Sequence, residues 1–288
     1  MLDIKVEKKV ISNVVQKTIS VIVLNRVGKK IYESNVLGKP MAMWVENAVK
    51  DFNHQLLDYD GKKEVKTFVK SHLNNSDYTL VLYSNIPLLI KGVISHLVEF
   101  VTCKESVACK LPVGFMVNTE YLKKSKDIMF DSVYNFNLEY FYEINNKTDL
   151  TYAVKKLSQR INNFYLEKGV DIEDVDNVLI EPSVRISAGV TLMSHTTLKG
   201  NTSIDKGTII KENSVIINST IGKDCLISSS NVVDSTLFDN VCISSFCEIV
   251  DSTLKEDVIV GRYSSVIGRT VRKKTHLPER STYVKTKE

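Results

Sequence analysis

Aliphatic residues recur every six positions in the second half of the chain. Six consecutive positions of one register are aliphatic, namely Ile180, Ile186, Leu192, Leu198, Ile204 and Ile210. The positions two residues earlier are all β-branched, namely Val178, Val184, Val190, Thr196, Thr202 and Thr208. After a shift of register, the pattern continues in three similar segments that begin at Asn218, Asp234 and Asp251. A six-residue period predicts a parallel β-helix, in which three short strands make one triangular coil and the aliphatic side chains point inwards.

The same period bounds the predicted β-helix to residues 170–268. The hexads end near Val266, which leaves room for about five coils of roughly eighteen residues each. We expect Ile186 and Ile204 to be fully buried inside the prism. A β-sandwich of ordinary strands is the alternative, but a sandwich gives no reason for a six-residue period.

The first third of the chain alternates between strand-like and helix-like segments. Residues 19–24 and 78–83 are apolar runs typical of buried strands, whereas residues 41–52 have helical spacing. A second helix should follow Pro87 and extend to about Val101. This alternation predicts an α/β domain with a parallel sheet covered by helices. Ligands of such sheets bind beyond the carboxyl ends of strands, so the segments after Leu24 and Tyr83 are the expected site.

A linker helix is predicted at residues 148–169, between these two parts. Thr148 can cap its start and Gly169 suits its end. One apolar stripe follows the helical period, formed by Leu150, Ala153, Val154, Leu157, Ile161 and Phe164. Part of this stripe is expected to meet a neighbouring copy of the chain.

Four short motifs occur in an order that resembles one known family. They are GKPM at residues 38–41, LYSNIPL at 82–88, GFMV at 114–117 and EINN at 143–146. They are similar to GKPM, to LxGDVPL, to the strand that carries NTGIY, and to the passage into the β-helix of the GlmU family. That family is bifunctional, combining N-acetylglucosamine-1-phosphate uridyltransferase with glucosamine-1-phosphate acetyltransferase. The resemblance implies a reduced, Rossmann-like nucleotidyltransferase-like domain at residues 1–147 and a left-handed parallel β-helix after the linker.

The phosphate loop of the family is altered in this chain. Where the family has LAAGxGTRM after the first strand, residues 24–31 read LNRVGKKI. A nucleotidyltransferase needs closely spaced glycines, so that backbone N–H groups reach the triphosphate. Only Gly28 remains, and Lys29 and Lys30 are the residues that could attract a phosphate. Alternatively, the two lysines lie on a solvated loop that binds no ligand.

The magnesium ligands that the resemblance implies are altered as well. The family holds Mg²⁺ with the aspartate of GDVP and an asparagine of its NN pair. The corresponding residues here are Asn85 and either Asn145 or Asn146. Because Mg²⁺ prefers carboxylate oxygens, two neutral amides make a poor site, and we expect Mg²⁺ only if nucleotidyl transfer is retained. We expect no other cofactor.

The acetyltransferase half also lacks its expected catalytic residues. Its site in the family lies far along a longer β-helix and uses a histidine with basic and amide partners. In this half the chain has only His195, predicted at an outward-facing corner, and His276, predicted in a tail beyond the last hexad. Neither has a sequence partner that marks a general base.

Composition and charge narrow the remaining choices. No apolar run reaches membrane-spanning length and no apolar signal segment follows the charged amino end, so we expect a cytoplasmic protein without membrane insertion. Five cysteines without CxxC spacing indicate neither a zinc site nor a disulfide scaffold. Residues 262–288 hold eight basic and two acidic residues. We interpret 269–288 as a basic tail that caps the β-helix, and DNA is not an expected partner.

These observations favour a catalytically impaired sugar-nucleotidyltransferase homologue, a scaffold or sugar-nucleotide sensor near UDP-N-acetylglucosamine and cell-envelope precursor synthesis. The first alternative is an active uridyltransferase with an altered loop. The second is a hexapeptide acyltransferase. The resemblance and the flat faces of a triangular prism both imply a homotrimer.

Overall fold

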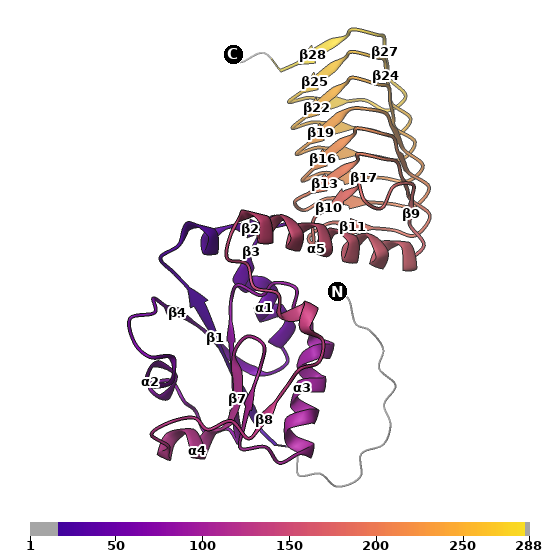
Figure 1. Ribbon diagram of the computed structural model, residues 1–288. Helices are drawn as coiled ribbons and strands as arrows, with labels where there is room; N and C mark the ends of the chain where they lie inside the picture. The colour runs from indigo at the N-terminus through magenta and orange to yellow at the C-terminus, as the bar shows by residue number, and fades with distance from the viewer. Residues whose placement is uncertain (1–16, 286–288) are drawn as a thin grey trace. The chain divides into compact units, whose positions relative to one another are not determined.

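The chain divides into two compact units, Met1–Val154 and Lys155–Glu288 (Figure 1). The computed structural model describes residues 17–285. Unit 1 is an α/β domain and unit 2 is a parallel β-solenoid, as the two hydrophobic periods predict. None of the helices within the described residues is long and apolar enough to cross a membrane.

Unit 1 is organised around a six-stranded sheet in the order β4-β1-β5-β7-β6-β8. Its strands are β1 (Ile19–Arg26), β4 (Asn53–Tyr59), β5 (Tyr78–Tyr83), β6 (Ala108–Lys110), β7 (Phe115–Asn118) and β8 (Ser132–Val133). Strand β1 pairs parallel with β4 and β5, as the sequence predicts. The prediction of a wholly parallel sheet is wrong at β7, which runs antiparallel to both β5 and β6. The connection between β6 and β7 is too short for a parallel crossover, so the two strands form a hairpin.

Helices cover both faces of this sheet. Alternate residues of β1 face opposite sides, so Val21 and Val23 pack beneath α1 (Met41–Val49) and α3 (Lys91–Cys103). Ile22 and Leu24 lie in a second apolar cluster with side chains of α2 (Val65–Lys70) and α4 (Thr119–Lys124). The predicted helix over residues 41–52 ends three residues early, at Val49. The short elements η1 (Lys30–Glu33), β2 (Asn35–Val36), β3 (Lys39–Pro40) and η2 (Leu138–Phe141) connect the larger ones.

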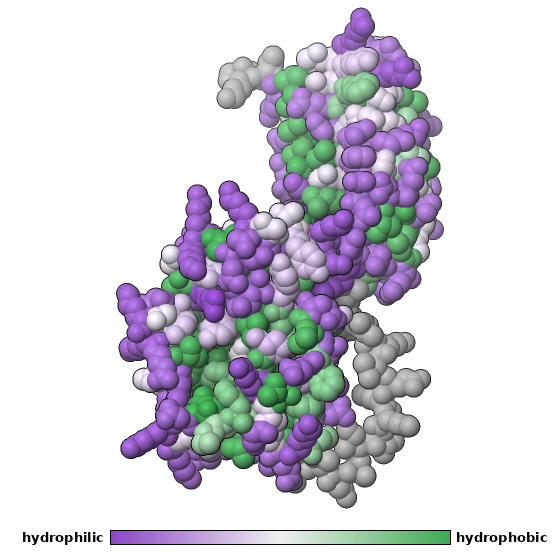
Figure 2. Space-filling view, viewed as in Figure 1, coloured by the Kyte–Doolittle hydropathy of each residue, from purple (hydrophilic) through white to green (hydrophobic). Residues whose placement is uncertain are grey.

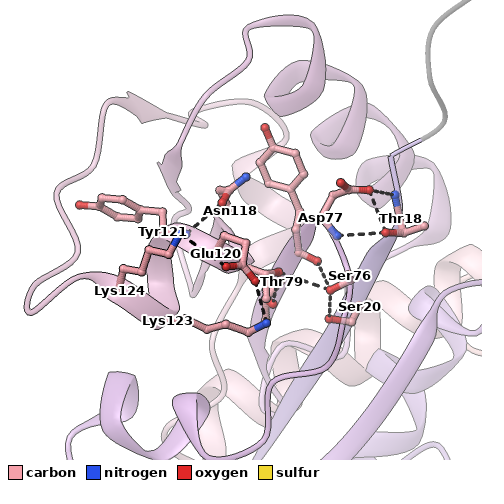
Figure 3. Close-up of polar contacts among 12 residues, drawn as sticks. Thr18, Ser20, Ser76, Asp77, Thr79, Asn118, Glu120, Tyr121, Lys123 and Lys124 are labelled. Atoms are coloured by element: carbon pink, nitrogen blue, oxygen red, sulfur yellow. Dashed lines mark hydrogen bonds and ion pairs between the residues drawn. The ribbon is translucent and has the colours of Figure 1, made fainter.

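A hydrogen-bonded network fastens the amino-terminal edge of the sheet (Figure 3). The Asp77 carboxylate accepts hydrogen bonds from the backbone N–H and the hydroxyl of Thr18, at 2.7 and 2.8 Å. The hydroxyls of Ser20 and Ser76 lie 2.8 Å apart, and those of Thr79 and Thr119 lie 2.9 Å apart. These contacts join the starts of β1 and β5 to the start of α4, so they hold this edge of the sheet together.

Unit 2 stacks its strands into three parallel sheets. One sheet contains β10 (Leu179–Ile180), β13 (Thr197–Lys199), β16 (Val215–Ile217), β19 (Asn231–Val233), β22 (Glu248–Val250), β25 (Ser265–Ile267) and β28 (Thr282–Val284). The second contains β11 (Arg185–Ile186), β14 (Ser203–Ile204), β17 (Thr220–Ile221), β20 (Thr236–Leu237), β23 (Thr253–Leu254) and β26 (Thr270–Val271). The third contains β9 (Asp171–Ile172), β12 (Thr191–Leu192), β15 (Ile209–Ile210), β18 (Leu226–Ile227), β21 (Cys242–Ile243), β24 (Ile259–Val260) and β27 (His276–Leu277). Each strand pairs in parallel with the strand one coil away.

Two predictions about the solenoid need correction. The coils do not end near Val266, because β26, β27 and β28 continue the three sheets to Val284. Most of the predicted basic tail is therefore the last coil. Ile204 is buried as predicted, but Ile186, on the edge strand β11 of its sheet, is only partly buried.

Buried serines explain why the repeat contains Asn or Asp, then Ser, Thr and an aliphatic residue. The Ser235 hydroxyl donates to the carbonyl of Val233 at 2.7 Å and accepts the N–H of Ser252, one coil further on, at 3.0 Å. Ser219 accepts the N–H of Ser235 in the same way, at 3.1 Å. The residue before each serine takes a left-handed conformation with positive φ, which Asn and Asp tolerate better than most residues. The repeat thus encodes both the corner and the contact that joins successive coils.

Helix α5 (Lys147–Glu167) is the predicted linker helix. Thr148 does not cap it, because the helix begins one residue earlier. The Asn146 side chain instead accepts the N–H of Asp149 at 3.0 Å, and the Asp149 carboxylate accepts the N–H of Asn146 at 3.2 Å, which is a capping box. Gly169 has φ +82° and ends the helix as predicted. Leu157, in the predicted stripe, is fully buried within a single chain, so the stripe gives no support for a neighbouring copy there.

Candidate functional site

The carboxyl edge of the unit 1 sheet is the candidate functional site. Strands β4 and β5 lie on either side of β1. The chain continues from β1 to β4 on one side and from β5 towards β6 and β7 on the other, which makes a topological switch point between β1 and β5. Open α/β sheets bind their ligands beyond the carboxyl ends of the strands at such a point. The sequence predicted this edge from the segments that follow Leu24 and Tyr83.

Arg26, the last residue of β1, is at the centre of the edge. Its guanidinium carbon lies 4.5 Å from the centroid of the Tyr83 ring, within the range of a cation–π contact. One guanidinium nitrogen donates to the Tyr32 hydroxyl at 3.3 Å, and the other lies 3.7 Å from a carboxylate oxygen of Glu143. Burial raises the pKa of the Tyr83 phenol, so this ring stays neutral at pH 7. Arg26 therefore brings a fixed positive charge to the switch point.

The segment around Ile144 closes over this edge through two sets of hydrogen bonds. Ile144 donates its N–H to the Asn85 carbonyl at 2.8 Å, and the Asn85 side-chain amide donates to the Ile144 carbonyl at 3.2 Å. The Tyr32 hydroxyl donates to the Asn145 side-chain oxygen at 3.4 Å. The loop after β1, the loop after β5 and the chain that enters α5 therefore meet at one place.

The predicted site residues lie at this edge of the sheet, but they differ in burial and in the contacts that they make. Asn85 is fully buried, and its side-chain oxygen has no hydrogen-bond partner among the described residues. Asn145 contacts Tyr32, and the Lys29 ammonium lies 5.7 Å from the same ring. Gly28 is exposed with φ +90°, and Lys30 is exposed at the start of η1. Lys29 and Asn145 thus lie beside Tyr32, whereas Asn85 is bonded to Ile144, the residue before Asn145.

These residues do not fit the Mg²⁺ ion that the resemblance implies. Asn145 already accepts a hydrogen bond from Tyr32, and Asn146 caps α5 instead of facing a metal. Glu143, the carboxylate of this cluster, is within ion-pair distance of Arg26. Mg²⁺ is usually held by one or two carboxylates together with waters and substrate phosphates, and a guanidinium beside it would oppose its charge. Among residues 17–285, no group of three histidine, cysteine or acidic residues is arranged to hold a metal.

Sequence reasoning missed Arg26, Tyr32, Tyr83 and Glu143. Arg26 and Tyr83 each end a strand, which is a signal that the sequence contains, because side chains at strand ends reach the switch point. The partnership of Arg26 with Glu143 joins distant segments of the chain, and no local pattern encodes it.

The histidines of unit 2 are exposed on the solenoid surface. His195 occupies a corner with φ +59°, as predicted for an outward-facing corner residue. His276 was predicted in a tail but begins β27, a strand of the last coil.

Comparisons with known proteins identify relatives of the solenoid. Residues 210–283 match the family model described as GlmU-like, C-terminal hexapeptide. The chain is similar to the bifunctional protein GlmU of Latilactobacillus sakei subsp. sakei (strain 23K), with 33% identity over 102 residues, which cover 35% of this chain and 22% of that protein. It is also similar to the bifunctional protein GlmU of Acaryochloris marina (strain MBIC 11017), with 38% identity over 76 residues, 26% of this chain and 17% of that protein. The match spans only about a fifth of the length of these relatives, and the hexapeptide region of the chain is GlmU-like.

Proposed function

We propose that the protein is a sugar-nucleotidyltransferase homologue without metal-dependent transfer, acting in the cytoplasm as a scaffold or sugar-nucleotide sensor. Its link to UDP-N-acetylglucosamine and cell-envelope precursor synthesis rests on the GlmU-like solenoid, which we take to be left-handed. The observation that carries the proposal is the contact between Arg26 and Glu143 at the switch point. Arg26 supplies positive charge at this edge through a guanidinium, and its contact with the Glu143 carboxylate supports a site that works without a metal cation.

An assay of nucleotidyl transfer tests the loss of catalysis. The purified protein, given UTP, N-acetylglucosamine-1-phosphate and Mg²⁺, is expected to release no pyrophosphate. Replacing Asn85 by Asp should not restore activity, because Arg26 and Tyr32 would still fill the edge. Mg²⁺-dependent turnover on the order of 1 per second or faster would overturn the proposal.

A binding experiment tests the sensor role. Arg26 and the exposed Lys29 supply positive charge for a diphosphate, so UDP-N-acetylglucosamine should bind equally well with Mg²⁺ or with EDTA. Arg26→Gln should weaken that binding at least tenfold in isothermal titration calorimetry. Arg272→Gln, an exposed arginine of the last coil, is the matched control and should leave binding unchanged. Failure of the wild-type protein to bind would leave only the scaffold role.

One observation favours the active alternative. Gly28 retains a positive φ, and a Cβ atom at this position would meet nothing within 4 Å, so the turn after β1 is still open. A phosphate could approach the backbone there, and the transfer assay decides between the two candidates.

The solenoid also offers a surface for the proposed homotrimer. In the sheet that contains β16, β19, β22, β25 and β28, the third residue of each of these strands contributes to an outward aliphatic column of half-buried side chains: Ile217, Val233, Val250, Ile267 and Val284. Figure 2 shows hydrophobic side chains along the side of the solenoid where Figure 1 labels these strands. We call these five residues the aliphatic column, and a flat column of this kind suits packing against another solenoid.

A further inference from the structure

The guanidinium of Arg26 already has partners on the nitrogens that a phosphate would bind. One terminal nitrogen donates to the Tyr32 hydroxyl at 3.3 Å, and the other lies 3.7 Å from a carboxylate oxygen of Glu143. The centroid of the Tyr83 ring lies 4.5 Å from the guanidinium carbon. Arginine binds phosphates through these same N–H groups. An anionic ligand that uses both nitrogens must therefore replace a partner that is present in this structure.

The contact between Arg26 and Glu143 is weak enough to be exchanged. Its length of 3.7 Å exceeds that of a direct charge-assisted hydrogen bond, which is about 2.7–2.9 Å. The two side chains are 30% and 32% exposed, so water screens the attraction between them. Ion pairs at such exposure contribute little to stability. A ligand that carries more negative charge than one carboxylate can replace Glu143 at this position.

The chain beside Glu143 is held in place by contacts that do not involve its side chain. Ile144 is fully buried, donates its N–H to the Asn85 carbonyl at 2.8 Å and accepts the Asn85 amide at 3.2 Å. The N–H of Asn145 donates to the Asp149 carboxylate at 2.9 Å. The ion pair is therefore not needed to fix this segment. Its backbone instead keeps the Glu143 carboxylate beside Arg26 at a high effective concentration.

Positive charge at this edge extends beyond Arg26. The Lys29 ammonium lies 5.7 Å from the Tyr32 ring, and exposed Lys30 begins η1. A diphosphate has enough charge and length to meet the guanidinium and an ammonium together. A single carboxylate group meets only one of them. The ligand class that can replace Glu143 is therefore a diphosphate.

We propose that Glu143 is an internal competitor for the anion site at Arg26. Its carboxylate pairs with the guanidinium in the free protein, and the diphosphate of a bound ligand displaces it. The inference rests on the proposed sensor function and adds how the response of that sensor is set. Apparent affinity falls with the fraction of the protein in which the site is free, so Glu143 raises the ligand concentration needed for a response.

Isothermal titration calorimetry with UDP-N-acetylglucosamine and with inorganic pyrophosphate tests the competition. Glu143→Gln should bind both ligands about two- to fivefold more tightly than the wild type, which is the contribution of an exposed ion pair. Glu143→Asp keeps the charge but has a shorter side chain, so it should also bind more tightly. Glu33→Gln removes the same charge from the exposed residue after Tyr32, and this matched control should bind like the wild type.

Two further measurements show whether Glu143 acts through Arg26. In the Arg26→Gln background, Glu143→Gln should give no gain in affinity, because the contact that it removes is already absent. Without any ligand, phenylglyoxal should modify Arg26 faster in Glu143→Gln than in the wild type, as measured by peptide mass spectrometry. Exposed Arg272 is the reference and should react at the same rate in both proteins.

The outcomes separate this inference from the proposed function. Equal binding of both ligands by wild type and Glu143→Gln overturns the competition and leaves the sensor role intact. Pyrophosphate binding that increases in Glu143→Gln, without binding of UDP-N-acetylglucosamine, removes the sugar nucleotide but keeps the competitor. Absence of binding of either ligand by both proteins removes the sensor role and the competition together.

Three other results would contradict the contact itself. Equal rates of Arg26 modification would show that Glu143 does not cover the guanidinium. A gain in Glu33→Gln as large as that in Glu143→Gln, with none in Glu143→Asp, would reduce the effect to overall charge. Weaker binding by Glu143→Gln together with a lower melting temperature would assign Glu143 to the stability of unit 1.

Discussion

At the scale of single residues, Asp77 links the amino edge of unit 1 to pH. Hydrogen bonds from the Thr18 backbone and hydroxyl depress the pKa of this carboxylate below its usual value of 3.8. A depressed pKa stabilises the folded state above the unfolded pKa, and this stabilisation is lost as the pH falls through the folded value. We expect unit 1 to lose stability below about pH 4.

The variant Asp77→Asn isolates this contribution. It should be less stable than the wild type at pH 7, and its stability should change less between pH 5 and pH 3. Urea unfolding followed by Trp44 fluorescence measures both, because Trp44 lies in α1 of the same unit. Glu173→Gln, in the solenoid, is the control. Equal pH profiles for Asp77→Asn and wild type would contradict the role of the Thr18 contacts.

Burial also determines which cysteine reacts faster with a thiol reagent. Cys103 is exposed at the end of α3, whereas desolvation raises the pKa of the Cys225 thiol to about 11. Thiolates are the reactive form, so at pH 8 an aromatic disulfide reagent should modify Cys103 while Cys225 stays protonated and shielded. Peptide mass spectrometry after a short exposure identifies the modified residue, and Cys103→Ser should remove most of the rapid phase. Rapid labelling of Cys225 would show that the coil opens locally.

The candidate site shows how far single residues can be predicted from sequence. The positions of Asn85 and Asn145 follow from motifs and from the rule that strand ends meet at a switch point. The side chains that hold this edge together do not follow, because Arg26, Tyr32 and Glu143 meet only after the sheet has formed.

At the scale of elements, the inward column of the solenoid determines whether the coils fold. Ile204 is 2% exposed and lies between Ile186 and Ile221 in its sheet. Ile204→Asp would bury an unpaired carboxylate among aliphatic side chains, so we expect insoluble or unfolded protein. Ile204→Val should cost only about 0.5–1.5 kcal/mol in thermal unfolding. Ile186→Asp should be tolerated better because this edge position is partly exposed, and a soluble Ile204→Asp variant with unchanged melting temperature would contradict the register.

The end of the solenoid shows where periodicity alone fails. The inward positions continue as Val271, Leu277 and Tyr283. Closely spaced basic residues lie between these positions, so the apolar period is hard to recognise in the sequence. Hydrophobic periodicity predicts a strand clearly only where the residues between the apolar positions are not a dense run of charges. Backbone pairing shows instead that β25 lies between β22 and β28, so the last coil covers Val266.

Truncation tests this corrected boundary. A chain that ends after Gly268 lacks β26, β27 and β28, and it exposes unpaired backbone on three strands. We expect its solenoid to melt several degrees lower, since each kcal/mol lost lowers the melting temperature of small to medium units by roughly 2–8 °C. The full-length chain is the reference. Equal melting temperatures for the two chains would favour a dispensable tail.

At the scale of the whole molecule, the aliphatic column determines the proposed trimer. Half-buried Val250 lies between Val233 and Ile267 at the middle of the column. Packing against another solenoid would bury these side chains, so a charge at Val250 should weaken the trimer without entering the core. The chain weighs 32.5 kDa, and light scattering should report three times that mass for the wild type and a lower mass for Val250→Asp.

The matched control is Ile259→Asp, which places the same charge on an exposed aliphatic position of a different sheet. It should keep the mass of the wild type if the trimer forms through the aliphatic column. A wild-type protein that stays at the monomer mass over a wide concentration range would refute the trimer. Equal loss of mass in both variants would place the contact on more than one face, whereas loss in Val250→Asp alone assigns it to the sheet that contains β22.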